Sequence, residues 1–177
     1  MIKGDYLNLT KGQLKSKDGI DLYSRKDFDG MHTAGRVAAE ILDEIVTSVF
    51  PGQTTGKIDA IIEELIRDKN VESGTIGYRG YQHASCISVN HVVCHGIPSD
   101  KILKEGDILN IDVTVIKDGW YGDTSRMYVA GQPSRKAERL IQVTHDALFK
   151  GIDAVKPGKT FGDIGHAIQT YVEANRM

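Results

Sequence analysis

A stretch near the middle of the chain, NIDVTVIKDGWYGDTSRMYV (residues 110–129), decides the fold around it. Asp118-Gly119 separates two β-rich runs, and an Asp-Gly pair in that position is a strong signal for a two-residue hairpin turn. With this turn, Asp112 of the first strand lies opposite Ser125 of the second strand, and Asp123 precedes Ser125 by two residues on that strand. The sequence therefore predicts a β-hairpin with one aspartate in each strand.

The two aspartates share one face of the predicted hairpin. They are diagonal neighbours, so their backbones lie about 7 Å apart and their carboxylates can converge. The opposite face of the first strand is apolar because its alternate positions are Leu109, Ile111, Val113 and Val115. Like charges at this spacing repel and lose hydration, a cost that a shared proton or a bound cation offsets. The hairpin alone leaves three interpretations open: a metal site, an acid–base pair, or two carboxylates that face water.

His95 favours the functional interpretations. In VVCHGIP (residues 92–98) it ends an apolar run just before Gly and Pro, where a strand commonly exposes a functional group at a sheet edge. Short β-rich runs over residues 84–95 flank Asn90-His91, which we expect to form a hairpin tip. A lone histidine is nevertheless more often structural than catalytic.

Apolar residues recur at helical spacing on both sides of the predicted sheet. The first helix is predicted over residues 27–49, with the apolar positions Phe28, Met31, Ala34, Ala38, Ile41, Leu42, Ile45 and Val49. Thr55 is predicted to cap a second helix, whose core face is Ile58, Ile61, Ile62, Leu65 and Ile66. A third helix follows Gly131, with the apolar positions Ala137, Leu140, Ile141, Thr144, Leu148, Ile152 and Val155. A fourth helix begins near Phe161, so the pattern predicts a mixed fold of class α/β (α+β).

The helices contain an internal repeat. PGQTTGKIDAII (residues 51–62) matches PGKTFGDIGHAI (residues 157–168) at a constant offset of 106 positions. The alternative is that Pro-Gly followed by a capping threonine is simply a common helix junction. In a true repeat the first copy continues past Val71 into the predicted sheet, whereas the second stops at the equivalent position, Met177. We therefore expect the sheet of the second copy to be missing from this sequence.

Composition limits the classes of partner. The 22 basic and 24 acidic residues nearly cancel, and no basic run suggests a nucleic-acid or anionic-membrane surface. No segment approaches the roughly 20 apolar residues of a membrane helix, and Cys86 and Cys94 are expected to be buried, unpaired thiols. We expect a soluble cytoplasmic protein with a flexible arm over residues 1–26 and one domain over residues 27–177.

Two ordered segments carry a resemblance to a known family. SVNHVVCHGIP (residues 88–98) and LKEGDILNIDVTVIKDGWYGDTSRMYVAG (residues 103–131) resemble the type I methionine aminopeptidases, with their signatures CHGIP, GDIxNIDVTV and GDTSRM or GDTSKM. The similarity extends from about residue 27 to the end. It implies the pita-bread fold, in which two pseudosymmetric α/β halves enclose a dinuclear metal site, in agreement with the repeat.

The resemblance also implies roles for individual residues. Asp112 would be a ligand to one of two divalent ions (Co, Mn, Fe or Zn), Asp123 would bridge both, and His95 would contact substrate and help to carry a proton. The pocket for the methionine side chain would be lined by Tyr78, Tyr81 and Cys86. The carbonyl oxygens of Asn90 and Val92 would bind a structural Na⁺ or K⁺ ion.

The implied reaction is removal of the initiator methionine from nascent polypeptides with a small second residue. The family also needs a histidine in a Gly-His-Gly-Ile-Gly segment and two glutamates, all expected after residue 177, so this chain alone should have little or no activity. Two alternatives stay open: another pita-bread peptidase, of the Xaa-Pro type, and an inactive relative that acts as a binding module. The uncovered half is expected to promote self-association or binding of a partner.

Overall fold

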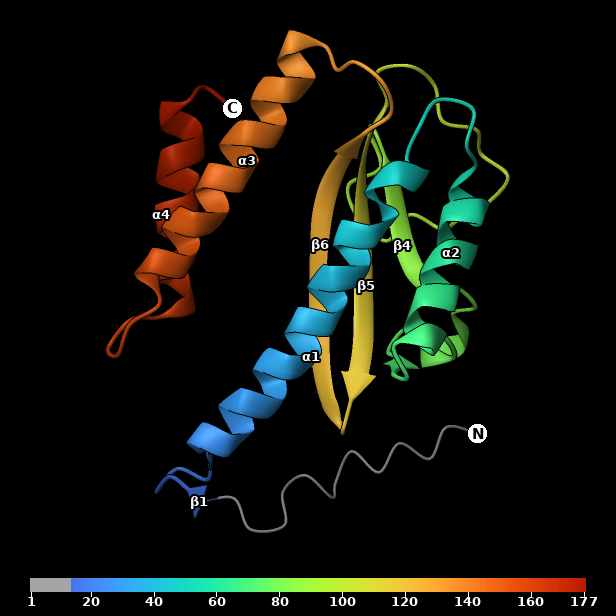
Figure 1. Cartoon of the computed structure of the whole chain (residues 1–177). Helices are drawn as coiled ribbons and strands as arrows, with labels where there is room; N and C mark the ends of the chain where they lie inside the picture. Colours follow the sequence, from blue (N-terminus) through green and yellow to red (C-terminus); the bar gives the residue numbers. More distant parts are fainter. Residues whose placement is uncertain (1–13) are drawn as a thin grey trace. The chain divides into compact units, whose positions relative to one another are not determined.

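The computed structural model describes residues 14–177, which divide after Gly131 into two compact units. The first unit contains a central antiparallel sheet with two helices, and the second consists of two further helices (Figure 1). A short hairpin, β1 (Leu14–Lys15) with β2 (Asp21–Leu22), precedes the first helix. The expected arm over residues 1–26 lies partly outside the described residues, and its boundary stays a prediction. No helix within residues 14–177 is long and apolar enough to cross a membrane.

The sheet is built around β5 (Ile108–Lys117), which has neighbours on both edges. On one edge it pairs along its whole length with β6 (Trp120–Val129), and on the other with β4 (Ser85–Val89) and β3 (Glu72–Ser73). Asp118 and Gly119 both have positive φ, at 50° and 81°, as a tight two-residue hairpin turn requires. The pairing of Asp112 with Ser125 and of Thr114 with Asp123 confirms the predicted register.

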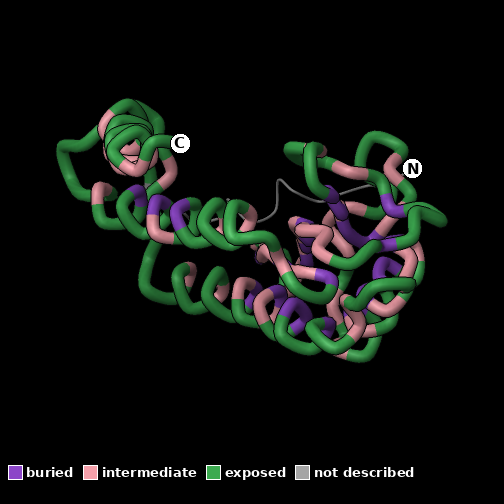
Figure 2. The backbone as a smooth tube through the Cα atoms, turned by 90° about the horizontal axis from the view of Figure 1, so that it is seen from above, coloured by how far each residue is buried: buried purple, intermediate pink, exposed green. Residues whose placement is uncertain are grey.

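The core of the first unit lies between this sheet and the helices α1 (Arg25–Glu44) and α2 (Thr55–Asp68). The predicted apolar face of β5 is confirmed, because Leu109, Ile111, Val113 and Val115 are fully buried. Ile58, Ile62 and Ile66 of α2 pack in the same cluster. In Figure 2 the buried positions of this unit gather on the inner sides of the helices and the sheet. The other face of β5 is thereby left to polar residues.

Helix α1 departs from the prediction at both ends. It begins at Arg25 after the N-cap Ser24, whose hydroxyl and N–H both donate to Asp27, and the short 3-10 helix η2 (Ile45–Ser48) follows it. Phe28 is 60% exposed and Met31 48% exposed, so the predicted core stripe is wrong over the first turns. Helix α1 already meets the hairpin end of the sheet at Gly30, where an added Cβ would overlap the indole of Trp120. The sheet ends near Gly30, so the first turns of α1 pack against little of it.

Helix α2 is capped by Thr54, not by Thr55 as predicted. The Thr54 hydroxyl accepts a hydrogen bond from the Lys57 N–H at 3.2 Å. Thr55 is buried instead, and its hydroxyl donates to the Ser99 carbonyl at 3.2 Å and accepts from the Ser99 N–H at 3.0 Å. Either threonine has the chemistry of a cap, and the contact with a distant loop decides between them.

The predicted hairpin around Asn90-His91 is only half correct. The chain turns at Asn90, whose φ is 55°, but residues 92–98 return as a loop and not as a strand. This loop lies along β4, because the Ile87 N–H donates to the Gly96 carbonyl at 2.8 Å and the Gly96 N–H donates to the Ser88 hydroxyl at 3.0 Å. A Cβ on Gly96 would overlap the backbone of Ile87, so glycine is needed for this close approach.

The second unit contains α3 (Arg135–Ala154) and α4 (Phe161–Ala174), and it confirms the internal repeat. Both bounds of α4 lie 106 positions after those of α2, and Thr160 caps α4 as Thr54 caps α2. The predicted apolar stripe of α3 is wrong in part. The face that is buried within the unit carries Val143, Ala147 and Gly151, whereas residues of the predicted stripe are exposed: Leu140, Leu148, Ile152 and Val155. Gly151 explains why this face of α3 packs against α4, because a residue with a Cβ at that position would press on Ile168 of α4.

Candidate functional site

The polar face of β5 and β6 brings the two predicted aspartates together. Asp112 is half-buried on β5, and Asp123 is exposed on β6 at the diagonal position. Burial raises the pKa of the Asp112 carboxyl above its ordinary value, and the charge of Asp123 and a hydrogen bond between the two side chains raise it further. His95 acts in the opposite sense and lowers this pKa. Thus the structure places Asp112, Asp123 and His95 at one location.

Gly122 controls the position of Asp123. It is buried on the helix-facing side of β6, where an added Cβ would overlap the carbonyl group of Ala34 in α1. The backbone of α1 therefore rests directly on β6. Because neighbouring residues of a strand face opposite sides, this contact directs Asp123 to the polar face.

His95 reaches the site from the loop along β4. Its φ is 55°, a left-handed conformation that costs a non-glycine residue about 1–2 kcal/mol. The hydrogen bonds of Gly96 to β4 hold the next residue in place. Strained residues of this kind concentrate at functional sites. Sequence analysis expected His95 at the end of a strand, whereas the structure presents it from a strained loop.

Of the residues expected to line a side-chain pocket, Tyr81 and Cys86 lie together. Cys86 is paired with Asp112 across β4 and β5, so both point to the polar face. Burial raises the pKa of the Cys86 thiol, and a hydrogen bond with Tyr81 partly opposes this. Burial and the interaction with Cys86 also raise the pKa of Tyr81. Tyr78 differs, since its ring is 60% exposed and contacts the guanidinium group of Arg79.

The two cysteines are free thiols but are not both buried as expected. Cys86 is partly buried, whereas Cys94 is exposed on the loop that carries His95. Their proximity is evident in the pKa of Cys86, which Cys94 raises slightly in addition to the effects of burial and of Asp112.

Asn90 and Val92 form the turn at the end of β4. The Asn90 N–H donates to the Ile108 carbonyl, its side-chain amide donates to Asp107 at 2.8 Å, and its side-chain oxygen accepts from the Ile108 N–H. The Val92 N–H donates to the Val89 carbonyl. Among the described residues, no hydrogen bond is made to the carbonyl oxygens of Asn90 or Val92. Both oxygens are thus available as ligands.

The family model that matches this chain is metallopeptidase family M24, over residues 29–177. This chain belongs to family M24. Membership of this metallopeptidase family implies that the protein binds divalent metal. Curated relatives named methionine aminopeptidase occur in Rickettsia prowazekii, with 53% identity over 154 residues, and in Escherichia coli K12, with 48% identity over 157 residues. The matches cover 87% and 88% of this chain but 60% of each relative, so the chain spans about three fifths of their length.

Solved structures place the M24 chain in the pita-bread fold. The methionine aminopeptidase of Rickettsia prowazekii matches with a TM-score of 0.85 and 52% identity, over 87% of this chain and 62% of that protein. The enzyme of the same name from Thermotoga maritima matches with a TM-score of 0.82 and 35% identity, over 86% and 62%. An X-Pro aminopeptidase from Thermotoga maritima, at 18% identity and a TM-score of 0.76, covering 88% of this chain and 42% of its own length, shares the fold.

The aspartate pair suits the metal expected of an M24 member, but only as part of a ligand set. Hard divalent ions prefer carboxylate oxygens, and a cation would relieve the repulsion that raises the pKa of Asp112. Within residues 14–177, no group of three or more His, Cys, Asp or Glu side chains is arranged to hold a metal ion. The fit therefore rests on two carboxylates.

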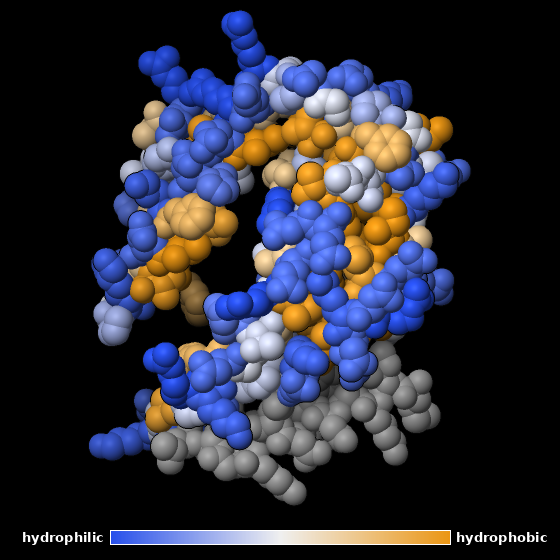
Figure 3. Space-filling view, viewed as in Figure 1, coloured by the Kyte–Doolittle hydropathy of each residue, from blue (hydrophilic) through white to orange (hydrophobic). Residues whose placement is uncertain are grey.

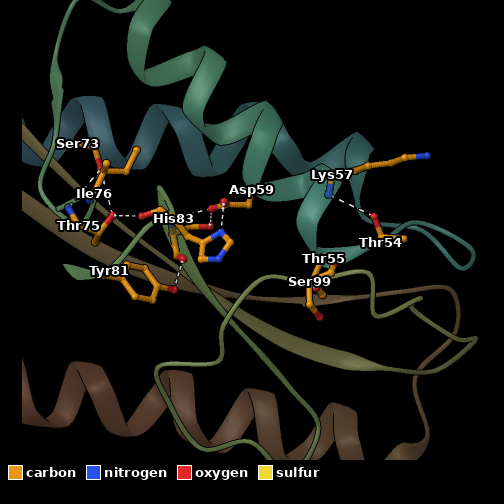
Figure 4. A network of polar contacts seen from close by, with 11 residues as sticks. Thr54, Thr55, Lys57, Asp59, Ser73, Thr75, Ile76, Tyr81, His83 and Ser99 are labelled. Atoms are coloured by element: carbon orange, nitrogen blue, oxygen red, sulfur yellow. Dashed lines mark hydrogen bonds and ion pairs between the residues drawn. The ribbon is translucent and has the colours of Figure 1, made fainter. Parts of the chain in front are cut away.

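Sequence analysis missed a buried polar network in this M24 chain. It links Asp59 of α2 to His83 and Ser85 at the start of β4, and is drawn in Figure 4 with the Thr55–Ser99 contact nearby. The sequence pattern around His83 predicts no role for it. The signal was present in the sequence, because Asp59 lies between Ile58 and Ile62 on the apolar face of a helix. An acidic residue at such a position requires a partner.

Proposed function

We propose that this M24 chain is part of a metalloaminopeptidase that removes the initiator methionine from nascent polypeptides with a small second residue. The observation that carries the proposal is the convergence of Asp112, Asp123 and His95 on the polar face of the sheet. The names of the relatives from Rickettsia prowazekii and Escherichia coli support the choice of substrate.

In this proposal Asp112 would be a ligand to one of two divalent metal ions, and Asp123 would be a ligand to both. Bound at such a site, divalent metal supplies Lewis acidity toward a carbonyl oxygen and a water with a lowered pKa. The chain itself contributes the orientation of both carboxylates, because the register of the hairpin and the contact at Gly122 fix the two strands.

His95 is proposed to contact the substrate and to help carry a proton. Its loop places it near enough to Asp112 to lower the pKa of that carboxyl. Tyr81 and Cys86, with Tyr78, are proposed to receive the methionine side chain. A partly buried thiol and an aromatic ring suit a soft, polarizable thioether.

Further parts of the proposal concern the environment of the chain. The carbonyl oxygens of Asn90 and Val92, to which no residue within 14–177 donates a hydrogen bond, are proposed to bind a structural Na⁺ or K⁺ ion. We also propose a cytoplasmic location, where nascent polypeptides are the substrate, and self-association through the exposed apolar residues of the second unit.

The test uses a chimera in which residues 1–177 replace the matching part of the Rickettsia prowazekii relative. With Mn²⁺, Co²⁺ or Fe²⁺ present, the chimera should release methionine from a Met-Ala-Ser peptide, and residues 1–177 alone should release little or none. Circular dichroism and a metal-binding isotherm check that the chimera is folded and loaded. A folded, metal-loaded chimera that leaves the peptide intact would contradict the proposal.

The same assay separates the alternatives. Faster cleavage of an Ala-Pro peptide than of Met-Ala-Ser would indicate an Xaa-Pro peptidase. CHGIP and the spacing of Tyr78 and Tyr81 favour the methionine enzyme. A folded chimera that binds metal weakly and cleaves neither peptide would indicate an inactive binding module.

A further inference from the structure

Asp59 is the one acidic or basic residue that is buried among residues 14–177. Its side chain is 8% exposed, and both carboxylate oxygens are engaged. Oδ1 accepts hydrogen bonds from the Ser85 N–H at 2.9 Å and from the Ser85 hydroxyl at 2.7 Å. Oδ2 lies 3.0 Å from Nδ1 of His83 (Figure 4). The carboxylate is thus held by one short segment, residues 83–85.

This arrangement makes the position of the segment energetically important. A buried carboxylate without partners is very unfavourable, and hydrogen bonds to a charged group are stronger than neutral ones. Among the described residues, the hydrogen-bond partners of the Asp59 carboxylate all lie within residues 83–85. Displacing this segment from α2 would leave the carboxylate buried and unsatisfied, so Asp59 fixes the start of β4 against the helix.

The same segment connects the two residues that we place in the substrate pocket. Ser85 faces α2, and the next residue, Cys86, faces the polar side beside Asp112. The Tyr81 hydroxyl donates to the Ser85 carbonyl at 2.8 Å, and the Tyr81 ring meets the His83 ring edge-on, with centroids 5.6 Å apart. Each residue that Asp59 contacts therefore either touches Tyr81 directly or is the sequence neighbour of Cys86.

We propose that Asp59 is a positioning residue, which holds Tyr81 and Cys86 in the geometry of the side-chain pocket. The identity of the pocket's ligand rests on the proposed function, whereas the positioning of the two residues does not. Thr55 provides an internal comparison. It lies one turn earlier on α2 and is equally buried, but it holds the loop at Ser99 and not the pocket segment.

The first test measures the reactivity of Cys86, and needs no catalytic activity. In a Cys94→Ser background, Cys86 is the single thiol, and its alkylation by iodoacetamide is followed by mass spectrometry over a range of pH. Asp59→Ala should raise the rate about tenfold or more, because local opening of the segment becomes easier. Asp59→Asn keeps an oxygen acceptor for Ser85 and should restore most of the protection. Ser85→Ala should give an intermediate rate.

The control is Tyr128→Phe, which removes a buried hydrogen bond to the Leu42 carbonyl between β6 and α1, away from the pocket. When the variants are compared under conditions that give them equal free energies of unfolding, as measured with urea, Tyr128→Phe should leave the rate of Cys86 alkylation unchanged. An Asp59→Ala rate equal to that of Tyr128→Phe would overturn the proposal, because it would show a general structural role. If Asp59→Ala does not fold, the same comparison is made with Ser85→Ala, and a Cys86 rate equal to that of Tyr128→Phe again overturns the proposal.

The second test measures kinetics in the chimera described above. Asp59→Ala should raise KM for Met-Ala-Ser more than it lowers kcat, since the pocket and not the metal ligands is disturbed. An unchanged KM with a lower kcat would overturn the assignment to the pocket. If the unaltered chimera releases no methionine but Asp59→Ala still exposes Cys86, the proposed function fails and the positioning of Tyr81 and Cys86 stands.

Discussion

At the residue scale, the site combines two carboxylates that disfavour each other. Asp112 loses hydration through burial and also faces the charge of Asp123, and both effects raise its pKa. Without a bound cation, the pair can reduce this cost by retaining a proton, and His95 offsets part of it. A metal ion and a proton therefore compete for the same carboxylate oxygens. The pKa of Asp112 thus reports on the charge interactions that a metal ion would relieve.

Asp123→Asn tests this competition. Removing the neighbouring charge should bring the pKa of Asp112 down toward its ordinary value, and NMR titration of the Asp112 carboxyl carbon in the metal-free chain measures it. Mn²⁺ affinity should fall by at least about 100-fold, since loss of an outer-shell partner alone costs 10- to 100-fold. Ser125→Ala, at the position paired with Asp112, is the control and should change neither quantity.

The pH dependence of metal binding follows from the same shift. Because Asp112 has a raised pKa, it takes up a proton at a higher pH than an ordinary aspartate as the solution is acidified. As the pH is lowered, the Mn²⁺ affinity of the unaltered chain should therefore begin to fall at a pH above about 4, the usual pKa of aspartate. Affinity that stays constant down to that range would show that Asp112 is not a ligand.

At the element scale, the contact between α1 and β6 positions the site. Gly122 lets the helix backbone lie on the strand, and the alternation of the strand then places Asp123 on the other face. Helix α1 and the strand that carries Asp123 are thus coupled through a position that has no side chain. Backbone contact of this kind leaves little room for adjustment.

Gly122→Ala should destabilise the chain by about 1–3 kcal/mol, as overpacking of a core does. Its matched control is Gly35→Ala in α1, where an added Cβ meets nothing within 4 Å. Gly35→Ala should instead stabilise by about 0.5–1 kcal/mol, because alanine is the better helix former. Urea denaturation measures the free energy of unfolding for both. Equal effects of the two substitutions would contradict the described contact.

At the scale of the whole molecule, the second unit exposes an unusual amount of apolar side chain. Figure 3 shows hydrophobic surface over α3 and α4. The exposed large apolar residues of this unit are Leu140, Leu148, Phe149, Ile152, Val155, Phe161 and Met177. The internal repeat explains their presence, because Leu140 and Leu148 lie 106 positions after Ala34 and Leu42, which α1 buries against its sheet. An apolar surface of this kind promotes association.

Sedimentation velocity tests the association. Residues 1–177 should sediment as a concentration-dependent mixture of monomer and larger species. Leu148→Lys combined with Ile152→Lys should shift the mixture to monomer, because both charges fall on the exposed face of α3. Lys136→Glu, on the same helix but at a polar position, is the control. A monodisperse monomer at every concentration would contradict the prediction.

Much of the fold could be predicted because it depends on local chemistry. Asp118-Gly119 specifies a tight turn, and a side-chain period of two then determines which residues of β5 and β6 share a face. The diagonal placement of Asp112 and Asp123 follows directly. The repeat was equally evident, since the same capped helix occurs twice.

Other features were decided by tertiary contacts. Thr54 and Thr55 are chemically equivalent as caps, and the hydrogen bonds between Thr55 and Ser99 decide that Thr54 is the cap. The apolar residues of α3 lie on two faces of the helix, and α4 covers one of them. His95 was expected on a strand, but Gly96 packs on the backbone of Ile87 and holds it in a loop. Asp59 is joined to His83 and Ser85 across more than 20 positions of sequence. The sequence alone thus determined periodicity, turns and register, which arise within a few residues, whereas partners distant in the chain emerge only when packing brings their elements into contact.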